Sequence, residues 1–150
     1  MTHFLLSPDD ADMLTDFNTI KDIIKDDDFG FFLDAYKDVV ENFDIYKNNN
    51  ANYNVEGNYL KIKLICAKWF DCYLIIWGPK AKSKIHDHAD NGCVYKILQG
   101  SLKETTFFHI NLLQRSKKIL GVGEVGEIHN DIGYHCMENL LDAHAVSIHF

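Results

Sequence analysis

The chain has 150 residues, about the length of one domain, and a net charge of −7. That acidic balance argues against a nucleic-acid-binding surface, which is usually basic. A hydrophobic fraction of 47% is enough to fill one core, and no apolar run approaches the roughly 18 residues of a membrane span. The N-terminus has no signal-peptide pattern and the four cysteines form no CxxC pair. We therefore expect a cytoplasmic protein with reduced thiols and no membrane or nucleic-acid partner.

Residues 7–45 are expected to be helical. Ser7 suits a helix N-cap because Pro8 follows it at the first helical position. Apolar residues recur at helical spacing from Leu14 to Ile24, and a second apolar stripe begins at Phe31. The segment DDDFG at 26–30 separates the two stripes, so we expect a break there.

From residue 59 the hydrophobic pattern becomes that of strands. Polar and apolar side chains alternate, and short apolar runs end at glycine or polar residues. We expect strands at residues 59–64, 70–77, 93–98, 105–110, 118–122, 127–130 and 146–150. Helices first and many short strands after them predict an α+β chain whose bulk is a β-barrel or sandwich. The sequence shows no internal repeat and no phosphate-binding loop.

The segment His86-Asp87-His88 is the most informative for chemistry. In a strand, residues two apart face the same way, so both imidazoles would lie on one side. Two imidazoles on one strand are spaced to bind one metal ion, and a third histidine from another strand would leave positions open for a substrate. An HxH pair alone is also compatible with ordinary surface or core histidines.

The surrounding sequence has a wider pattern. His88 is followed by four residues and Cys93, and then by six residues and Gly100. Later comes Gly133-Tyr134-His135, with Asn139 four residues after the histidine. This resembles the two motifs of the cupin superfamily. Two features depart from the general pattern: Cys93 stands at the usual place of a glutamate ligand, and no proline precedes Gly133.

The stretches KIHDHADNGCVYKILQGSLKETTF, NDIGYHCMEN and AVSIHF resemble the cysteine dioxygenases, which are mononuclear non-haem iron cupins. The resemblance is close over about 69–150 and loose over the helical first third. It implies a mainly β fold with N-terminal helices, a cupin-type β-barrel or jelly roll. It also implies one domain over 1–150, with a helical segment at 1–45 packed on a barrel at 59–150.

The resemblance also implies roles for individual residues. His86, His88 and His135 would be the ligands of one Fe(II). Cys93 would be the cysteine that forms a thioether crosslink with a tyrosine in animal-type members. Ser147 and His149 match the Ser-x-His of the hydrogen-bonding relay that leads to that tyrosine. Tyr59 and Lys61 stand where the family has a Tyr-x-Arg that grips the substrate carboxylate, and Lys63 takes this place if the alignment shifts by one step.

The implied reaction agrees with the chemistry of these groups. Three neutral imidazoles leave the full 2+ charge on iron, which then attracts the thiolate and amine of a cysteine substrate. Adding both atoms of O2 to the substrate sulfur gives the sulfinic acid. The expected partners are L-cysteine and O2, and the expected role is cysteine catabolism by a monomer.

The sequence departs from the family at two places. The crosslinking tyrosine would be residue 151, beyond Phe150, so either the chain belongs to a longer protein or the crosslink is missing. Lysine is a point charge without the bidentate fork of arginine, so Lys61 predicts weaker carboxylate recognition or a preference for a related thiol such as 3-mercaptopropionate or cysteamine.

Two other functions remain open from the sequence. A cupin that binds metal or a small ligand without turnover fits the same motifs. A β-barrel interaction module with an incidental HxH would leave Cys93 and the spacing of His135 and Asn139 unexplained. Trp77 is expected in the core or lining the pocket, whereas Cys72 and Cys136 are expected to be small buried residues.

Overall fold

The computed structural model describes residues 17–48, 53–54, 57–66, 71–86, 92–108, 111–128 and 133–150. Short helices come first: α2 (Phe17–Asp26), α3 (Gly30–Ala35), α4 (Lys37–Glu41) and α5 (Phe43–Lys47). The strands follow: β1 (Tyr53–Asn54), β2 (Tyr59–Cys66), β3 (Asp71–Trp77), β4 (Cys93–Gln99), β5 (Ser101–Phe107), β6 (Gln114–Gly121), β7 (Val125–Ile128), β8 (Tyr134–Glu138) and β9 (Ala145–His149). Within the described residues, no helix has the length and apolar character needed to cross a bilayer.

The helical segment breaks where the sequence predicts. Helix α2 ends at Asp26, and the Asp27 side chain accepts the backbone N–H of Phe29 at 2.8 Å. Asp28 accepts the N–H of Gly30 in the same way at 2.9 Å. These side-chain bonds replace the helical pattern at the turn. The second apolar stripe differs from the expectation, because it forms three short helices rather than one.

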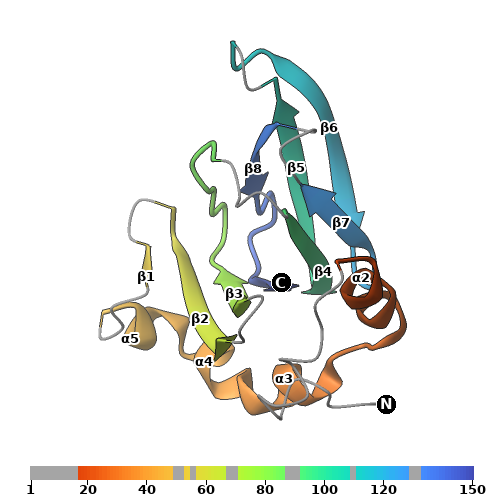
Figure 1. Ribbon diagram of the computed structural model, residues 1–150. Coiled ribbons are helices and arrows are strands. Elements are labelled where there is room, and N and C mark those ends of the chain that lie inside the picture. Colours follow the sequence, from red (N-terminus) through yellow and green to blue (C-terminus); the bar gives the residue numbers. More distant parts are fainter. Residues whose placement is uncertain are drawn as a thin grey trace.

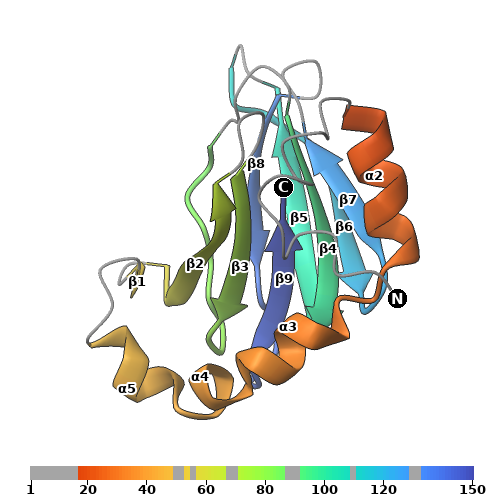
Figure 2. The same ribbon diagram turned by 60° about the horizontal axis from the view of Figure 1, so that its bottom comes forward.

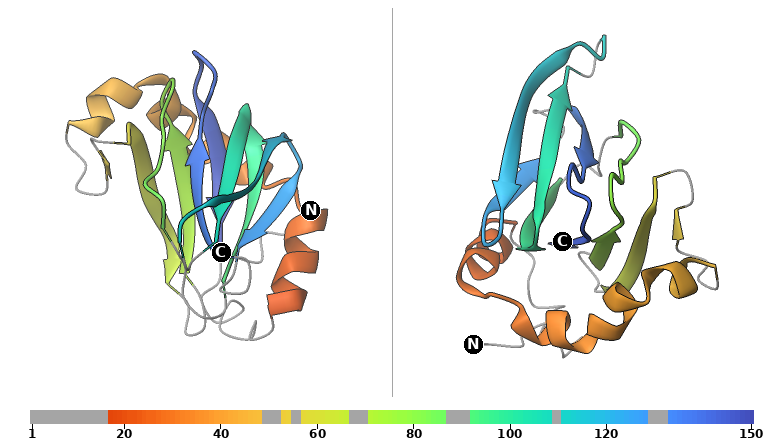
Figure 3. Two further views of the ribbon diagram at one scale, coloured as in Figure 1. Left: turned by 90° about the horizontal axis from the view of Figure 1, so that it is seen from above. Right: turned by 180° about the vertical axis from the view of Figure 1, so that it is seen from behind.

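The strands form two antiparallel sheets. The larger has the order β1-β2-β3-β9-β4-β7, and the smaller has the order β6-β5-β8. Figure 1 shows the smaller sheet on one side of the molecule, with the helices near the opposite end, and Figure 3 shows the β5–β6 pair standing across from β2 and β3. This is the two-sheet arrangement of a jelly roll.

Some strand boundaries differ from the expected ones. Strand β5 begins at Ser101 rather than residue 105, and β6 begins at Gln114 rather than residue 118. The segment at 134–138 was expected to carry a site residue but not to be a strand, and it forms β8. His86 lies in an isolated bridge with His135 rather than in a long strand, and His88 lies outside the described residues.

The six-stranded sheet buries side chains on both of its faces, so β4 and β9 are buried almost throughout. Figure 2 shows the helices running past β2, β3, β9 and β4. One apolar cluster joins this sheet to the helices and includes Ile24, Phe29, Phe43, Leu74, Val94 and Ile148. The other lies between the two sheets and includes Ile75, Trp77, Tyr95, Ile97, Leu102 and Met137. The candidate site borders the second cluster.

Candidate metal centre

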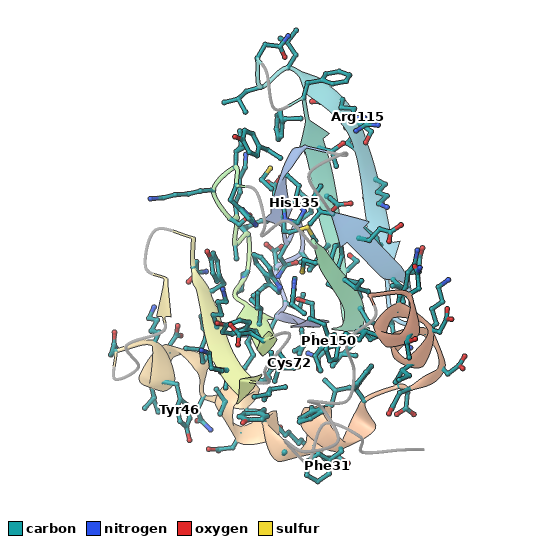
Figure 4. The ribbon with its side chains drawn as sticks, in the orientation of Figure 1. Phe31, Tyr46, Cys72, Arg115, His135 and Phe150 are labelled. Carbon is teal, nitrogen blue, oxygen red and sulfur yellow. The ribbon has the colours of Figure 1, made fainter. Side chains whose placement is uncertain are left out.

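Two histidines that are far apart in the sequence meet between the sheets. The Nε2 atoms of His86 and His135 lie 3.0 Å apart, and their rings are 4.5 Å apart between centroids. Backbone hydrogen bonds of 2.9 Å in both directions hold the segment around His86 against β8. Figure 4 shows His135 in the interior between the two groups of strands. The pairing of distant segments therefore fixes the relative position of the two rings.

The hydrogen bonds of the two rings decide which nitrogens face each other. His86 Nδ1 lies 2.7 Å from the carbonyl oxygen of Lys84, and His135 Nδ1 lies 2.9 Å from Glu104 Oε2. A carbonyl and a carboxylate only accept, so each Nδ1 carries the proton and donates it. When both rings are neutral, both Nε2 atoms direct lone pairs into the same small space. Two lone pairs at this separation favour a cation between them.

The separation also fits a shared metal ion. A nitrogen ligand lies about 2.1 Å from a divalent transition metal, so two such ligands at a right angle are about 3.0 Å apart. His88, the third expected ligand, lies outside the described residues. Among the residues that are described, no group of three or more histidine, cysteine or acidic side chains could hold a metal ion. The donor set His86 and His135 fits a metal such as iron, with the third ligand remaining a prediction.

Glu104 is a site residue that the sequence analysis did not identify. It lies on β5, its side chain is 1% exposed, and it accepts the Nδ1 proton of His135, which is also 1% exposed. Burial by itself raises the pKa of Glu104, but the hydrogen bond from His135, the Tyr95 hydroxyl and the positive charge of Lys118 lower it below its usual value. Glu104 therefore remains a carboxylate that can orient the His135 ring.

A hydrogen-bonded row crosses the inner face of the larger sheet. The indole N–H of Trp77 donates to Ser147 Oγ at 2.9 Å, and Ser147 Oγ shares a 2.7 Å hydrogen bond with His149 Nε2. The other ring nitrogen of His149, Nδ1, lies 3.9 Å from the sulfur of Cys93. The structure thus brings together Ser147, His149 and Cys93, as the family resemblance implies, and it adds Trp77 to them.

Cys93 is a neutral thiol in this setting. Burial raises its pKa to about 12, although the backbone of Phe150 and the charge of Lys61 lower it and Glu104 raises it. Cys72, Cys93 and Cys136 are all free thiols. Cys72 and Cys136 are buried, as the sequence predicts, and belong to opposite sheets.

Tyr59 and Lys61 lie on the same face of the larger sheet as this row. Tyr59 pairs with Trp77 in the strand register, and their rings are 4.9 Å apart between centroids. Lys61 pairs with Ile75, which pairs in turn with Ser147, and paired residues of antiparallel strands share a face. The Lys61 side chain is exposed, with its Nζ atom 4.1 Å from the centre of the Tyr73 ring.

The Asn139 side chain has a structural role. Its side chain is fully buried and donates to the carbonyl oxygens of Gly78 at 3.0 Å and Ala143 at 2.8 Å. Its own carbonyl accepts the N–H of Leu141 at 3.0 Å. Asn139 therefore joins the end of β3 to the loop after β8, which explains its place in the second motif without a chemical role.

Comparisons with known proteins agree with this architecture. A family model described as cysteine dioxygenase type I matches residues 17–150. Cysteine dioxygenase type 1 of Bos taurus is 37% identical over 86 residues, which is 53% of this chain and 43% of the relative. The Homo sapiens protein of the same name is 35% identical over the same shares. The chain thus matches less than half the length of these relatives.

Solved structures establish the fold. An oxalate oxidase in complex with the substrate analogue glycolate has a TM-score of 0.53 at 14% identity, covering 64% of this chain and 51% of that one. A cupin domain from Schizosaccharomyces pombe has a TM-score of 0.53 at 12% identity, covering 66% of each. With the two-sheet topology, these likenesses confirm the predicted cupin fold. Since the family model covers nearly all of the sequence, the chain belongs to the cysteine dioxygenase type I family.

Proposed function

We propose that this protein is an iron-dependent thiol dioxygenase that adds both atoms of O2 to the sulfur of L-cysteine. The observation that carries the proposal is the approach of His86 Nε2 and His135 Nε2 to 3.0 Å, with each Nδ1 atom held by an acceptor. Membership of the cysteine dioxygenase family supports the reaction class. The single domain, the monomeric state and the cytoplasmic location stay predictions.

His86, His88 and His135 would hold Fe(II). When bound, iron supplies open positions at which a thiolate and O2 can meet. The balance of the reaction is simple, because one thiol and one O2 give one sulfinic acid with no further reductant. Both oxygen atoms end on sulfur, and the sulfur supplies the electrons.

The chain's own residues would bind and orient the substrate. The Lys61 ammonium supplies a positive charge for the substrate carboxylate on the face that carries His149 and Cys93. Trp77 and Ser147 hold the His149 ring, so that its Nδ1 atom faces the Cys93 sulfur. A thioether between Cys93 and a tyrosine beyond residue 150 stays a prediction of the family resemblance.

Oxygen uptake by the iron-loaded protein tests the proposal. Adding L-cysteine under 18O2 should give cysteine sulfinic acid that carries two labelled oxygen atoms. His135→Ala should lose bound iron and activity together, whereas His144→Ala, on the far side of the larger sheet against Phe43, should keep both. Iron-loaded protein that consumes no O2 with any small thiol would leave a metal-binding cupin without turnover.

Substrate competition tests the role of Lys61. A lysine that binds the carboxylate as a point charge should discriminate between cysteine and cysteamine less than an arginine would. Lys61→Arg should therefore lower the KM for cysteine and leave that for cysteamine unchanged, while Lys117→Arg on exposed strand β6 should change neither. If Lys61→Arg changes the KM values for cysteine and cysteamine equally, Lys61 does not bind the substrate carboxylate.

A further inference from the structure

The phenol of Tyr95 lies beside the metal centre with no role in the proposed function. Its side chain is 0% exposed, on the face of β4 that faces the smaller sheet. Its ring stacks on His149 at 5.3 Å between centroids and lies 6.4 Å from the ring of His135. Tyr95 thus sits between the histidine of the Cys93 row and a candidate metal ligand.

The hydroxyl group of Tyr95 is exceptional within the described residues. It is the one buried side-chain nitrogen or oxygen atom there that makes no hydrogen bond. A buried polar group without a partner is destabilising, and most are satisfied in folded proteins. Such a hydroxyl therefore needs an acceptor nearby.

The sheet makes room for this hydroxyl opposite Tyr95. Gly126 is the register partner of Tyr95 on β7, and a Cβ atom on Gly126 would collide with the Cζ and Oη atoms of the phenol. The absence of a side chain at Gly126 lets the ring lie across β7 with its oxygen deep in the structure. Any larger residue at position 126 would displace the hydroxyl.

Glu104 is an acceptor on the same side of the site, because it holds the His135 ring, whose centre lies 6.4 Å from that of the Tyr95 ring. Burial raises the pKa of the Tyr95 phenol most, and the charge and hydrogen-bonding capacity of Glu104 raise it further. One carboxylate oxygen, Oε2, accepts from His135, and the other, Oε1, is 3.6 Å from Lys118 Nζ. A carboxylate has about four acceptor directions, so it can take another donor after a small rotation.

We propose that Tyr95 is a positioning residue of the metal centre: its hydroxyl donates to the Glu104 carboxylate, which in turn holds His135 Nδ1. The relay from Tyr95 through Glu104 fixes the ring of His135 with Nε2 toward His86. The inference rests on the proposed function, because it needs a metal ion at His135. It adds a residue on β4 to a site otherwise supplied by β5, β8 and the segment before β4.

Tyr95→Phe tests the relay, because it removes the hydroxyl and keeps the ring over Gly126. Cobalt(II) alone is the probe, and its affinity and its visible absorption bands report on the coordination geometry without turnover. We expect Tyr95→Phe to weaken cobalt(II) binding about 3–10-fold, which is less than the roughly 10–100-fold that direct hydrogen-bond partners of ligands contribute, because Tyr95 acts through Glu104. The absorption bands should shift, and the effect should vanish in a Glu104→Leu background.

The matched control is Tyr46→Phe. Tyr46 Oη also donates to a carboxylate, Asp38 Oδ2 at 2.8 Å, but on the helices far from His135, as Figure 4 shows. Tyr46→Phe should leave cobalt(II) affinity and spectrum unchanged. The melting temperature of the metal-free protein adds a second readout: Tyr95→Phe should lower it by about 2–4 °C if the hydroxyl is bonded.

The outcomes separate the two proposals. A wild-type protein that binds neither cobalt(II) nor iron would overturn the proposed function, and the relay with it. A wild-type protein that binds metal and consumes O2, with Tyr95→Phe identical in affinity and spectrum, would overturn the relay alone. A higher melting temperature for Tyr95→Phe, or an equal loss of affinity with and without Glu104, would also reject it.

Discussion

Single atoms of histidine rings determine what this site can bind. Each Nδ1 atom is paired with an oxygen that can only accept, so in their neutral forms the rings of His86 and His135 turn Nε2 lone pairs toward each other. The carbonyl that holds His86 comes from its own segment, at Lys84. Glu104, in contrast, comes from a neighbouring strand and bears a charge, which makes it the stronger and the more easily tested of the two partners.

Glu104→Gln should weaken metal binding by about 10–100-fold, because the ring of His135 loses its charged acceptor while the shape of the side chain is kept. Competition with a chelator measures the change in affinity. Glu138→Gln, at the end of β8 on the other face, is the matched control and should bind as the wild type does. Equal metal affinities for the Glu104 and Glu138 variants would show that Glu104 does not support the metal centre.

The raised pKa of the Cys93 thiol predicts how the free energy of unfolding changes with pH. Its pKa is about 12 in the folded protein and 9.0 as the reference for the unfolded chain. A raised pKa contributes stability that is complete below pH 9.0 and is lost as the pH rises toward 12, because only the unfolded thiol ionises in that window. Between about pH 8 and 10.5 the wild type should lose about 2 kcal/mol relative to Cys93→Ala.

Denaturant unfolding of both proteins across this range measures that difference. All other ionisable groups are the same in both proteins, so their contributions cancel in the comparison. A gap between the two unfolding free energies that stays constant from pH 8 to 10.5 would show that Cys93 ionises as readily in the folded as in the unfolded chain.

Residue patterns predicted part of this site. The spacing around His86, Cys93 and His135 identified the family, and Ser147 with His149 followed from it. The pattern does not reveal Glu104, because the expected strand begins at residue 105 and leaves Glu104 outside the alternation that turns it inward with Leu102 and Thr106. Tyr95 was missed because an apolar run such as 93–98 does not indicate which face each side chain occupies.

At the scale of elements, one lysine joins the helical segment to the larger sheet. Lys96, on the face of β4 opposite Tyr95, donates from Nζ to the carbonyl oxygens of Ile24 at 2.9 Å, Lys25 at 3.1 Å and Asp27 at 2.6 Å. These carbonyls belong to the end of α2, where the helix leaves its last acceptors unpaired and carries partial negative charge. Burial lowers the pKa of Lys96, although the charges of Asp27, Asp28 and Asp26 raise it.

Lys96→Met should lower the free energy of unfolding by about 2–3 kcal/mol, because it removes the donors of three carbonyls and keeps the length of the side chain. Hydrogen exchange should localise the loss to the last turn of α2. Lys117→Met, on exposed strand β6, is the control and should have no effect. Unchanged protection of α2 in the Lys96 variant would mean that apolar packing alone holds the helix.

The local sequence predicted the break after α2 correctly, but it did not predict the short helices or the length of β6. The break at 26–30 was predicted because Asp27 and Asp28 make bonds to the nearby backbone that need no tertiary context. The short helices after it were predicted as one stripe, because periodicity does not reveal where a segment bends to follow a sheet. The predicted length of strand β6 was too short. Its first six residues are exposed, so they lack the alternation of buried apolar and exposed polar side chains by which a strand is recognised.

At the scale of the whole molecule, the candidate centre lies where distant segments meet. His86 precedes β4 and His135 belongs to β8 of the smaller sheet, and mutual backbone hydrogen bonds join them. An ion held by both rings would therefore link the segment 82–86 to the smaller sheet in the folded state only. Because the unfolded chain does not bring these segments together, metal binding should add directly to the stability of the fold.

Thermal unfolding with and without metal tests this coupling. At a free metal concentration 100 times the dissociation constant, binding to the folded state adds about 2.7 kcal/mol, which corresponds to a rise in melting temperature of about 5–10 °C for a chain of this size. His135→Ala should abolish the rise, whereas His144→Ala, which packs against Phe43 away from the centre, should keep it. If the two variants respond to metal alike, the stabilising ion binds somewhere other than the facing rings of His86 and His135.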